Sequence, residues 1–112
     1  MSTPQFQDAK ETTFDVLEMV RRRPQFYLDG DRSISRLRSF LVGFHCGLGS
    51  CGFNFPMQQP DFHGFHDWVA HRLGFAESTS GWCNMIREKS KSEEDAFEQF
   101  FVLLAEFRKE PV

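Results

Sequence analysis

The sequence predicts an all-α protein, a compact single-domain bundle of about five helices, and three observations predict it. Apolar residues recur every three or four positions in several segments, as they do along one face of a helix. No segment shows strict two-residue alternation, and no β-hairpin signature such as Asn-Gly is present. The length of 112 residues fits one domain. We expect residues 1–10 to form a flexible tail and residues 11–112 to form the helical domain.

The first helix is expected to begin at Thr12 or Thr13 and to stop at Pro24, which cannot continue a helix. Thr12 and Asp15 have the spacing of a capping box. Residues 25–30 are expected to form a connector, in which Phe26, Tyr27 and Leu28 fold back onto the core. The apolar face of this helix consists of Phe14, Val16, Leu17 and Val20.

The second helix is predicted within residues 31–50, with Ser33 as its N-cap. Glycines in its second half weaken it, because glycine loses more backbone freedom than alanine in a helix. Either another backbone approaches closely there, or the helix ends early. The apolar face consists of Ile34, Leu37, Leu41, Phe44 and Leu48, and the glycines are Gly43, Gly47 and Gly49.

The third helix is predicted over residues 62–74, capped by Asp61 and ended by Gly74. A short fourth helix is expected to begin at Ser78 or Thr79. The buried positions of these two helices are expected to be Phe62, Phe65, Trp68, Val69, Leu73, Trp82, Met85 and Ile86.

The last helix is predicted within residues 92–111, where Ser92 and Asp95 have the spacing of a capping box. Acidic residues at its start and basic residues at its end suit the helix dipole. Its apolar stripe consists of Phe97, Phe100, Phe101, Leu104 and Phe107.

The composition favours a folded protein in a reducing compartment. Hydrophobic residues make up 40% of the chain, and 14 phenylalanines supply much apolar area. Cys46, Cys51 and Cys83 are too few for a disulfide scaffold. The first residues lack an apolar signal core, and no apolar run is long enough to span a bilayer. We therefore expect a cytoplasmic protein without membrane contact.

Histidine and cysteine side chains suggest two kinds of chemistry, a metal site and a reactive thiol, and neither matches a specific motif. His63 and His66 lie three apart on a predicted helix, but no second tight ligand pair accompanies them. Cys83 follows a predicted helix start, which can activate a thiol, although buried cysteines are common core residues. The sequence therefore predicts no enzyme, no catalytic residue, no metal and no cofactor.

Arginines between residues 21 and 38 suggest a helical nucleic-acid-binding module as the alternative function. The competing interpretation is structural, because cations in the last turn of a helix are favoured by its dipole. The net charge of −3 also disfavours direct nucleic-acid binding and favours a basic partner. The arginines concerned are Arg21, Arg22, Arg23, Arg32, Arg36 and Arg38.

Acidic side chains supply the candidate partner-binding residues. They cluster on the outer side of the first helix, around the glycine of the connector and at the start of the last helix, and such clusters otherwise form ordinary solvated helix faces. Carboxylates in these places could occupy a basic groove on a partner. The candidates are Glu11, Asp15, Glu18, Asp29, Asp31, Glu93, Glu94, Asp95 and Glu98.

Five segments lie in order between residues 23 and 107: "RPQFYL", "SISRLRSFLVGF", "WVAHRLGF", "STSGWCNMI" and "SEEDAFEQFFVLLAEF". In this order they resemble a family of small helical bacterial immunity proteins of toxin–immunity loci, including contact-dependent growth inhibition systems. The resemblance implies a cytoplasmic protein that binds one toxin domain and blocks its active site, without catalysis or cofactor. Some toxins of such loci are nucleases, including a ribonuclease A-like class, so the expected partner is a basic toxin domain.

Overall fold

The computed structural model describes residues 13–30, 32–50, 62–76 and 81–109. Within these residues the chain is helical and contains no strand, which confirms the predicted all-α class. One single-turn 3-10 helix, η1, accompanies the α-helices. In chain order the elements are α2 (Thr13–Arg22), α3 (Pro24–Tyr27), α4 (Ile34–Ser50), η1 (Phe62–Gly64), α5 (Phe65–Leu73), α6 (Gly81–Glu88) and α7 (Glu93–Lys109).

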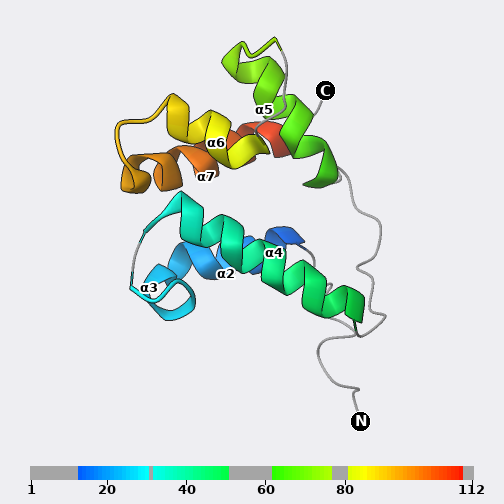
Figure 1. Ribbon diagram of the computed structural model, residues 1–112, viewed down its shortest axis with the longest axis vertical. Helices are drawn as coiled ribbons and strands as arrows, with labels where there is room; N and C mark the ends of the chain where they lie inside the picture. The colour runs from blue at the N-terminus through cyan, green and yellow to red at the C-terminus, as the bar shows by residue number, and fades with distance from the viewer. Residues whose placement is uncertain (1–12, 31, 51–61, 77–80, 110–112) are drawn as a thin grey trace.

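The helices form two layers that follow the order of the chain (Figure 1). One layer holds α2, α3 and α4, and the other holds α5, α6 and α7. Helix α4 contacts both α6 and α7, so it joins the two layers. Helices α5 and α6 pack against each other and against α7.

The core lies between these layers and consists of the apolar faces that the periodicity predicted. The most deeply buried side chains include Leu17 of α2, Ile34 and Leu37 of α4, Phe65 of α5 and Phe100 of α7. Most residues of the predicted faces are buried, and Phe62, Leu73, Trp82 and Phe101 are half-buried side chains that pack against the core. Burial of this apolar surface is the main term that stabilises the fold.

Proline ends the first helix as predicted, but the residues after it are not a simple connector. Helix α2 stops at Arg22, and Pro24 begins the single turn α3. Proline is well tolerated at the first position of a helix, because its missing N–H would be unpaired there anyway. Leu28 is buried as expected, whereas Phe26 is 72% exposed. The prediction that Phe26 folds onto the core was therefore wrong.

Helix α4 continues through its glycines to Ser50, so the expectation that it ends early was wrong. A Cβ atom added at Gly43 or Gly47 would meet nothing within 4 Å. No described backbone approaches α4 at these two positions, and both glycines face outward. The first turn of the helix is capped as predicted, because the Ser33 hydroxyl accepts the Arg36 N–H at 3.2 Å.

The predicted ends of the other helices are partly confirmed. Gly74 ends α5 in a left-handed conformation with φ of 81°, and its N–H reaches the carbonyl of His71. The third helix begins as η1 before α5, and Asp61, Ser78 and Thr79 lie outside the described residues. At α7 the Ser92 hydroxyl accepts the Asp95 N–H at 3.0 Å.

Candidate partner-binding surface

The acidic candidates on the first helix include one carboxylate that is already paired within the protein. Glu18 accepts hydrogen bonds from Nε of Arg21 at 2.9 Å and from Nε of Arg22 at 3.1 Å. The hydrogen bonds from Arg21, together with Arg22, hold the pKa of Glu18 down at about 2. Asp15 is exposed on the same helix, and Glu11 lies outside the described residues. Glu18 therefore stays charged but faces its own arginines.

The acidic turn after α3 presents an accessible carboxylate. Asp29 has φ of 56°, the left-handed region that aspartate tolerates better than most residues. Its side chain is 94% exposed, and its Oδ2 lies 3.8 Å from Nη1 of Arg36, too far for a hydrogen bond. Asp31 lies outside the described residues. Asp29 is thus held outward by the turn with only a loose ion pair.

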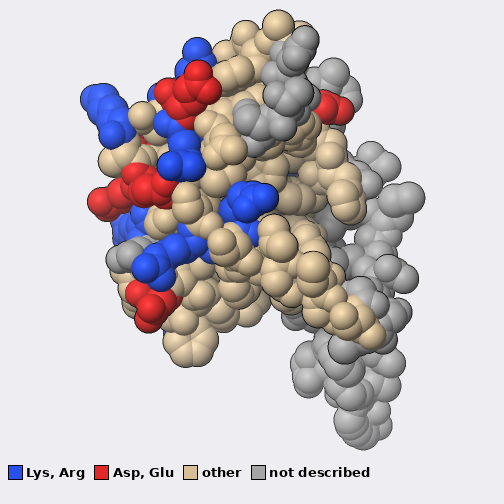
Figure 2. Space-filling view, viewed as in Figure 1, with Lys and Arg blue, Asp and Glu red and all other residues tan. Residues whose placement is uncertain are grey.

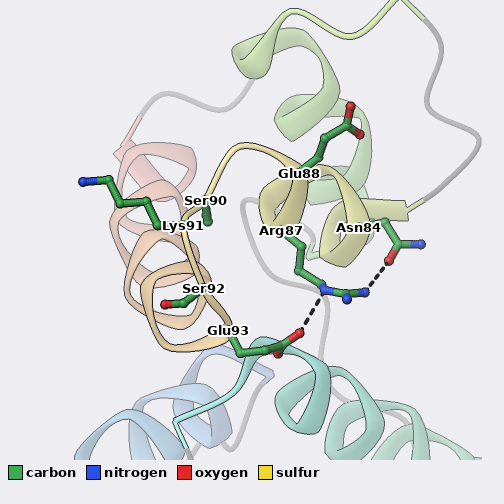
Figure 3. A pocket seen from close by; sticks show the side chains of 7 residues that line it. All are labelled: Asn84, Arg87, Glu88, Ser90, Lys91, Ser92 and Glu93. Carbon is green, nitrogen blue, oxygen red and sulfur yellow. Dashed lines mark hydrogen bonds and ion pairs between the residues drawn. The ribbon is translucent and has the colours of Figure 1, made fainter.

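Glu93 of α7 contacts residues of two other helices, and Figure 3 shows its pairing with Arg87 of α6. One oxygen accepts the Ser35 N–H at 3.0 Å and the Ser33 hydroxyl at 2.7 Å. The other accepts the Ser35 hydroxyl at 2.9 Å and lies 2.9 Å from Nε of Arg87. Glu93 of α7 therefore caps the N-terminus of α4 and pairs with α6.

The charge of Glu93 is stabilised by these contacts. Partial burial alone raises its pKa, but the hydrogen bonds from Ser35 and Ser33 and the positive charge of Arg87 outweigh that effect and lower it. An acid at a helix N-terminus is also favoured by the helix dipole. The negative charge of Glu93 thus stabilises the contact between α7 and α4.

The remaining acids of α7 have different surroundings. Asp95 accepts the N–H of Lys91 at 2.9 Å, within the cap of its own helix. Glu98 lies 3.2 Å from Nη1 of Arg32 and lines a small surface cavity with Arg21. Glu94 is exposed. The described acids therefore do not form one continuous face, and acidic and basic side chains alternate over the side of the molecule where α6 joins α7 (Figure 2).

The arginines proposed for nucleic acid are largely matched with carboxylates. Arg21 and Arg22 contact Glu18, Arg32 contacts Glu98, and Arg36 lies near Asp29. Glu18, the carboxylate that pairs with Arg21 and Arg22, lies about one helical turn earlier on α2. The described residues therefore offer a mixed charge pattern rather than a basic stripe.

An aromatic row at the surface was missed by the sequence prediction. Its four rings touch in succession, from Phe26 and Tyr27 in α3 to Phe40 and Phe44 in α4. The ring centroids are 4.9 Å apart for Phe26 and Tyr27, 6.1 Å for Tyr27 and Phe40, and 6.1 Å for Phe40 and Phe44. Tyr27, Phe40 and Phe44 are half-buried, and Phe26 is the most exposed ring of the row.

The middle of the aromatic row forms one wall of an open hollow between α3 and α4, the α3–α4 groove. It has a volume of about 580 Å³. Charged and hydroxyl side chains complete its rim. The lining residues are Tyr27, Leu28, Asp29, Ser35, Arg36, Ser39 and Phe40. The part of α4 after Arg38 contains no Asp, Glu, Lys or Arg, and Figure 2 shows this part of the helix in tan.

Cys83, His63 and His66 are the residues with candidate chemistry. Cys83 is buried and its Sγ lies 3.8 Å from the carbonyl of Ile34. Burial raises the pKa of the Cys83 thiol, which keeps it protonated at neutral pH. Burial, together with the charge of His63, lowers the pKa of His45, so His63 lies close enough to His45 to act on it. Among the described residues, no group of three or more potential ligands could hold a metal ion.

The chain matches no family model, no curated protein and no solved structure. Across the described part of the chain, no helix combines the length and apolar character needed to cross a membrane.

Proposed function

We propose that the chain is a non-catalytic immunity protein that binds a cognate bacterial toxin domain and neutralises it by covering its active site. The aromatic row is the observation that supports this proposal. Phe26 and its neighbours place large, rigid apolar surface beside an arginine and an aspartate. Aromatic residues and arginine are enriched at protein interfaces, where a few of them carry most of the binding energy.

The toxin domain is expected to be basic and to be a nuclease. The net charge of −3 favours association with a basic surface. Among the acidic candidates, Asp29 is the one that combines high exposure with a place on the groove rim. Glu18 and Glu93 are better explained by their internal contacts than by a partner.

Two features support a binding role over the alternatives. The protonated thiol of Cys83 is a poor nucleophile. Arg21, Arg22, Arg32 and Arg36, four of the six arginines between residues 21 and 38, lie near carboxylates, which reduces the positive charge that they offer to phosphates. The free thiols of Cys46 and Cys83 are consistent with action in the reducing cytoplasm of the cell that is protected.

Co-expression with the toxin domain encoded by the adjacent gene tests the proposal. The chain is expected to restore growth of a sensitive strain and to co-purify with the toxin domain as a stable complex. The purified complex is expected to lack the toxin's nuclease activity. If no neighbouring toxin domain is neutralised or bound, the proposal fails.

A matched pair of variants tests whether the aromatic row makes the contact. Phe26→Ser removes the most exposed ring of the row, and Val102→Ser removes an exposed apolar side chain of α7. Protection is expected to be lost or weakened in Phe26→Ser and retained in Val102→Ser. Equal protection by both variants would place the contact elsewhere.

A further inference from the structure

The α3–α4 groove combines two features that recognise the same kind of chemical group. Its wall carries the rings of Tyr27 and Phe40, and its rim carries the carboxylate of Asp29. The exposed ring of Phe26 extends the wall outward and contacts Tyr27 at a centroid distance of 4.9 Å. An aromatic face and a carboxylate both attract a cation.

The left-handed backbone at Asp29 points to a role beyond turning the chain. Asp29 is the one non-glycine residue in the described segments with positive φ, and Gly30 follows it with φ of 92°. Residues in sparsely populated backbone conformations are concentrated at ligand-binding and active sites. Here the conformation holds a carboxylate in solvent, where Arg36 approaches only to 3.8 Å.

We propose that this groove receives an arginine or lysine side chain of the toxin domain. This inference rests on the proposed function and names the part of the partner that the groove recognises. The aliphatic stem packs on Tyr27 and Phe40, and the cation lies against an aromatic face while pairing with Asp29. A basic side chain engages both features, whereas a carboxylate would face Asp29 and the negative ring faces.

Arg36 makes this inference unusually easy to test, because it lines the same groove. Its guanidinium repels an incoming cation and competes for Asp29. Loss of the Arg36 charge therefore strengthens binding of a basic side chain. The same change weakens binding of an acidic peptide or a nucleic acid, because both need the arginine.

A peptide titration followed by NMR measures the preference directly. A hexaarginine peptide, a hexaglutamate peptide and a six-nucleotide oligouridylate are added in turn to the full chain in low salt. Hexaarginine is expected to shift the amide signals of Tyr27, Asp29 and Phe40. Hexaglutamate and oligouridylate are expected to leave these signals in place, and a stronger response to either one would overturn the inference.

Two charge variants and one distant control complete the experiment. Asp29→Asn is expected to weaken hexaarginine binding about fivefold, the scale of one exposed ion pair, and Arg36→Gln is expected to strengthen it. Glu88→Gln, which changes an exposed acid of α6, is expected to leave the groove response unchanged. Stronger hexaarginine binding by Asp29→Asn, or weaker hexaarginine binding by Arg36→Gln, would overturn the inference.

Failure of this inference is separable from failure of the proposed function. If the chain neutralises the toxin domain while Asp29→Asn and Arg36→Gln both protect like the unchanged chain, the groove assignment is wrong and the function stands. If no toxin domain is neutralised but hexaarginine binds with the expected signs, the groove recognises basic side chains of a different partner.

Discussion

The aromatic rings of α5, α6 and α7 lie in the interior, whereas those of α3 and the outer face of α4 reach the surface. In the interior, Phe65 is fully buried and its ring lies 5.4 Å from both Phe100 and Phe107. At the surface, Phe26 contacts Tyr27 but remains 72% exposed. We call Phe65, Phe100 and Phe107 the interior cluster. The same residue type thus stabilises the fold in one region and remains available for a partner in the other.

This contrast shows why phenylalanine content alone does not separate a core from an interface. The interior cluster is enclosed by rings from several helices, and Trp68 and Trp82 also contact Phe65. The rings of the aromatic row contact one another in succession, and each is partly exposed to solvent. Removal of a ring should therefore cost stability in the interior cluster and binding in the aromatic row.

The largest expected effect is on the interior cluster. Phe65→Ala should lower the free energy of unfolding by about 3–5 kcal/mol, because it removes a buried ring and leaves a cavity. Chemical denaturation followed by circular dichroism measures the loss. A loss below about 1 kcal/mol would show that the interior cluster is not the packed centre of the fold.

Glu93 links α7 to α4 and α6, so loss of its charge should destabilise the packing of the two layers. Glu93→Gln should lower the free energy of unfolding by about 1–2 kcal/mol, since it weakens a helix cap and an ion pair at a partly exposed site. Glu94→Gln is the matched control and should change it by less than about 0.5 kcal/mol. Equal changes in the free energy of unfolding for the two variants would show that Glu93 does not stabilise the contacts among α4, α6 and α7.

The open face of α4 should tolerate a side chain where glycine now stands. Gly43→Ala should raise the free energy of unfolding by about 0.5–1 kcal/mol, because alanine is the better helix former and the new Cβ meets no neighbour within 4 Å. Gly74→Ala is the contrasting control and should be destabilising, because Gly74 has φ of 81°. Destabilisation by Gly43→Ala would indicate that this face is covered.

A smaller effect is expected from pH through His45, which lies 3.2 Å from the Thr13 hydroxyl. Burial, together with the charge of His63, lowers the pKa of His45 below its ordinary 6.5. The unfolded chain then binds the proton more readily, so stability is complete above pH 6.5 and falls as the pH drops toward the lowered pKa. Unfolding measured between pH 7.5 and pH 5 should show this decline, and His45→Gln should reduce it.

The smallest effect on stability is expected at the aromatic row. Phe26→Ser should change the free energy of unfolding by less than about 0.5 kcal/mol, because the ring is mostly exposed. The measurement is the one used for Phe65→Ala, so the two variants compare the regions directly. A large loss of stability in Phe26→Ser would mean that the ring serves the fold rather than a partner.

The helices and their buried faces could be predicted because the signals for them are local. Apolar spacing placed Leu17, Ile34 and Phe100 inside, and the caps at Ser33 and Ser92 follow from side chains that reach backbone three residues away. Gly74 ends α5 for the same kind of reason. Such interactions depend on the order of residues and little on the rest of the fold.

The candidate site could be predicted only in part. Asp29 is exposed in the predicted connector segment, but the acidic residues at the start of α7, which were predicted as one cluster, make different contacts. Glu93 lies next to Glu94 in sequence, yet it binds Ser33 and Ser35 from 60 and 58 residues away. No local pattern indicates such a contact, because it depends on how α7 packs against α4.

The sequence by itself determined an all-α chain, most of the helix ends and the faces that are buried, because periodicity and capping act over one or two turns. The tertiary structure decided which charges pair with each other and which aromatic rings remain at the surface. Those outcomes depend on the packing of helices that are distant in sequence. Phe26 follows Pro24 in a single-turn helix at the edge of its layer, so its ring has no second layer to cover it.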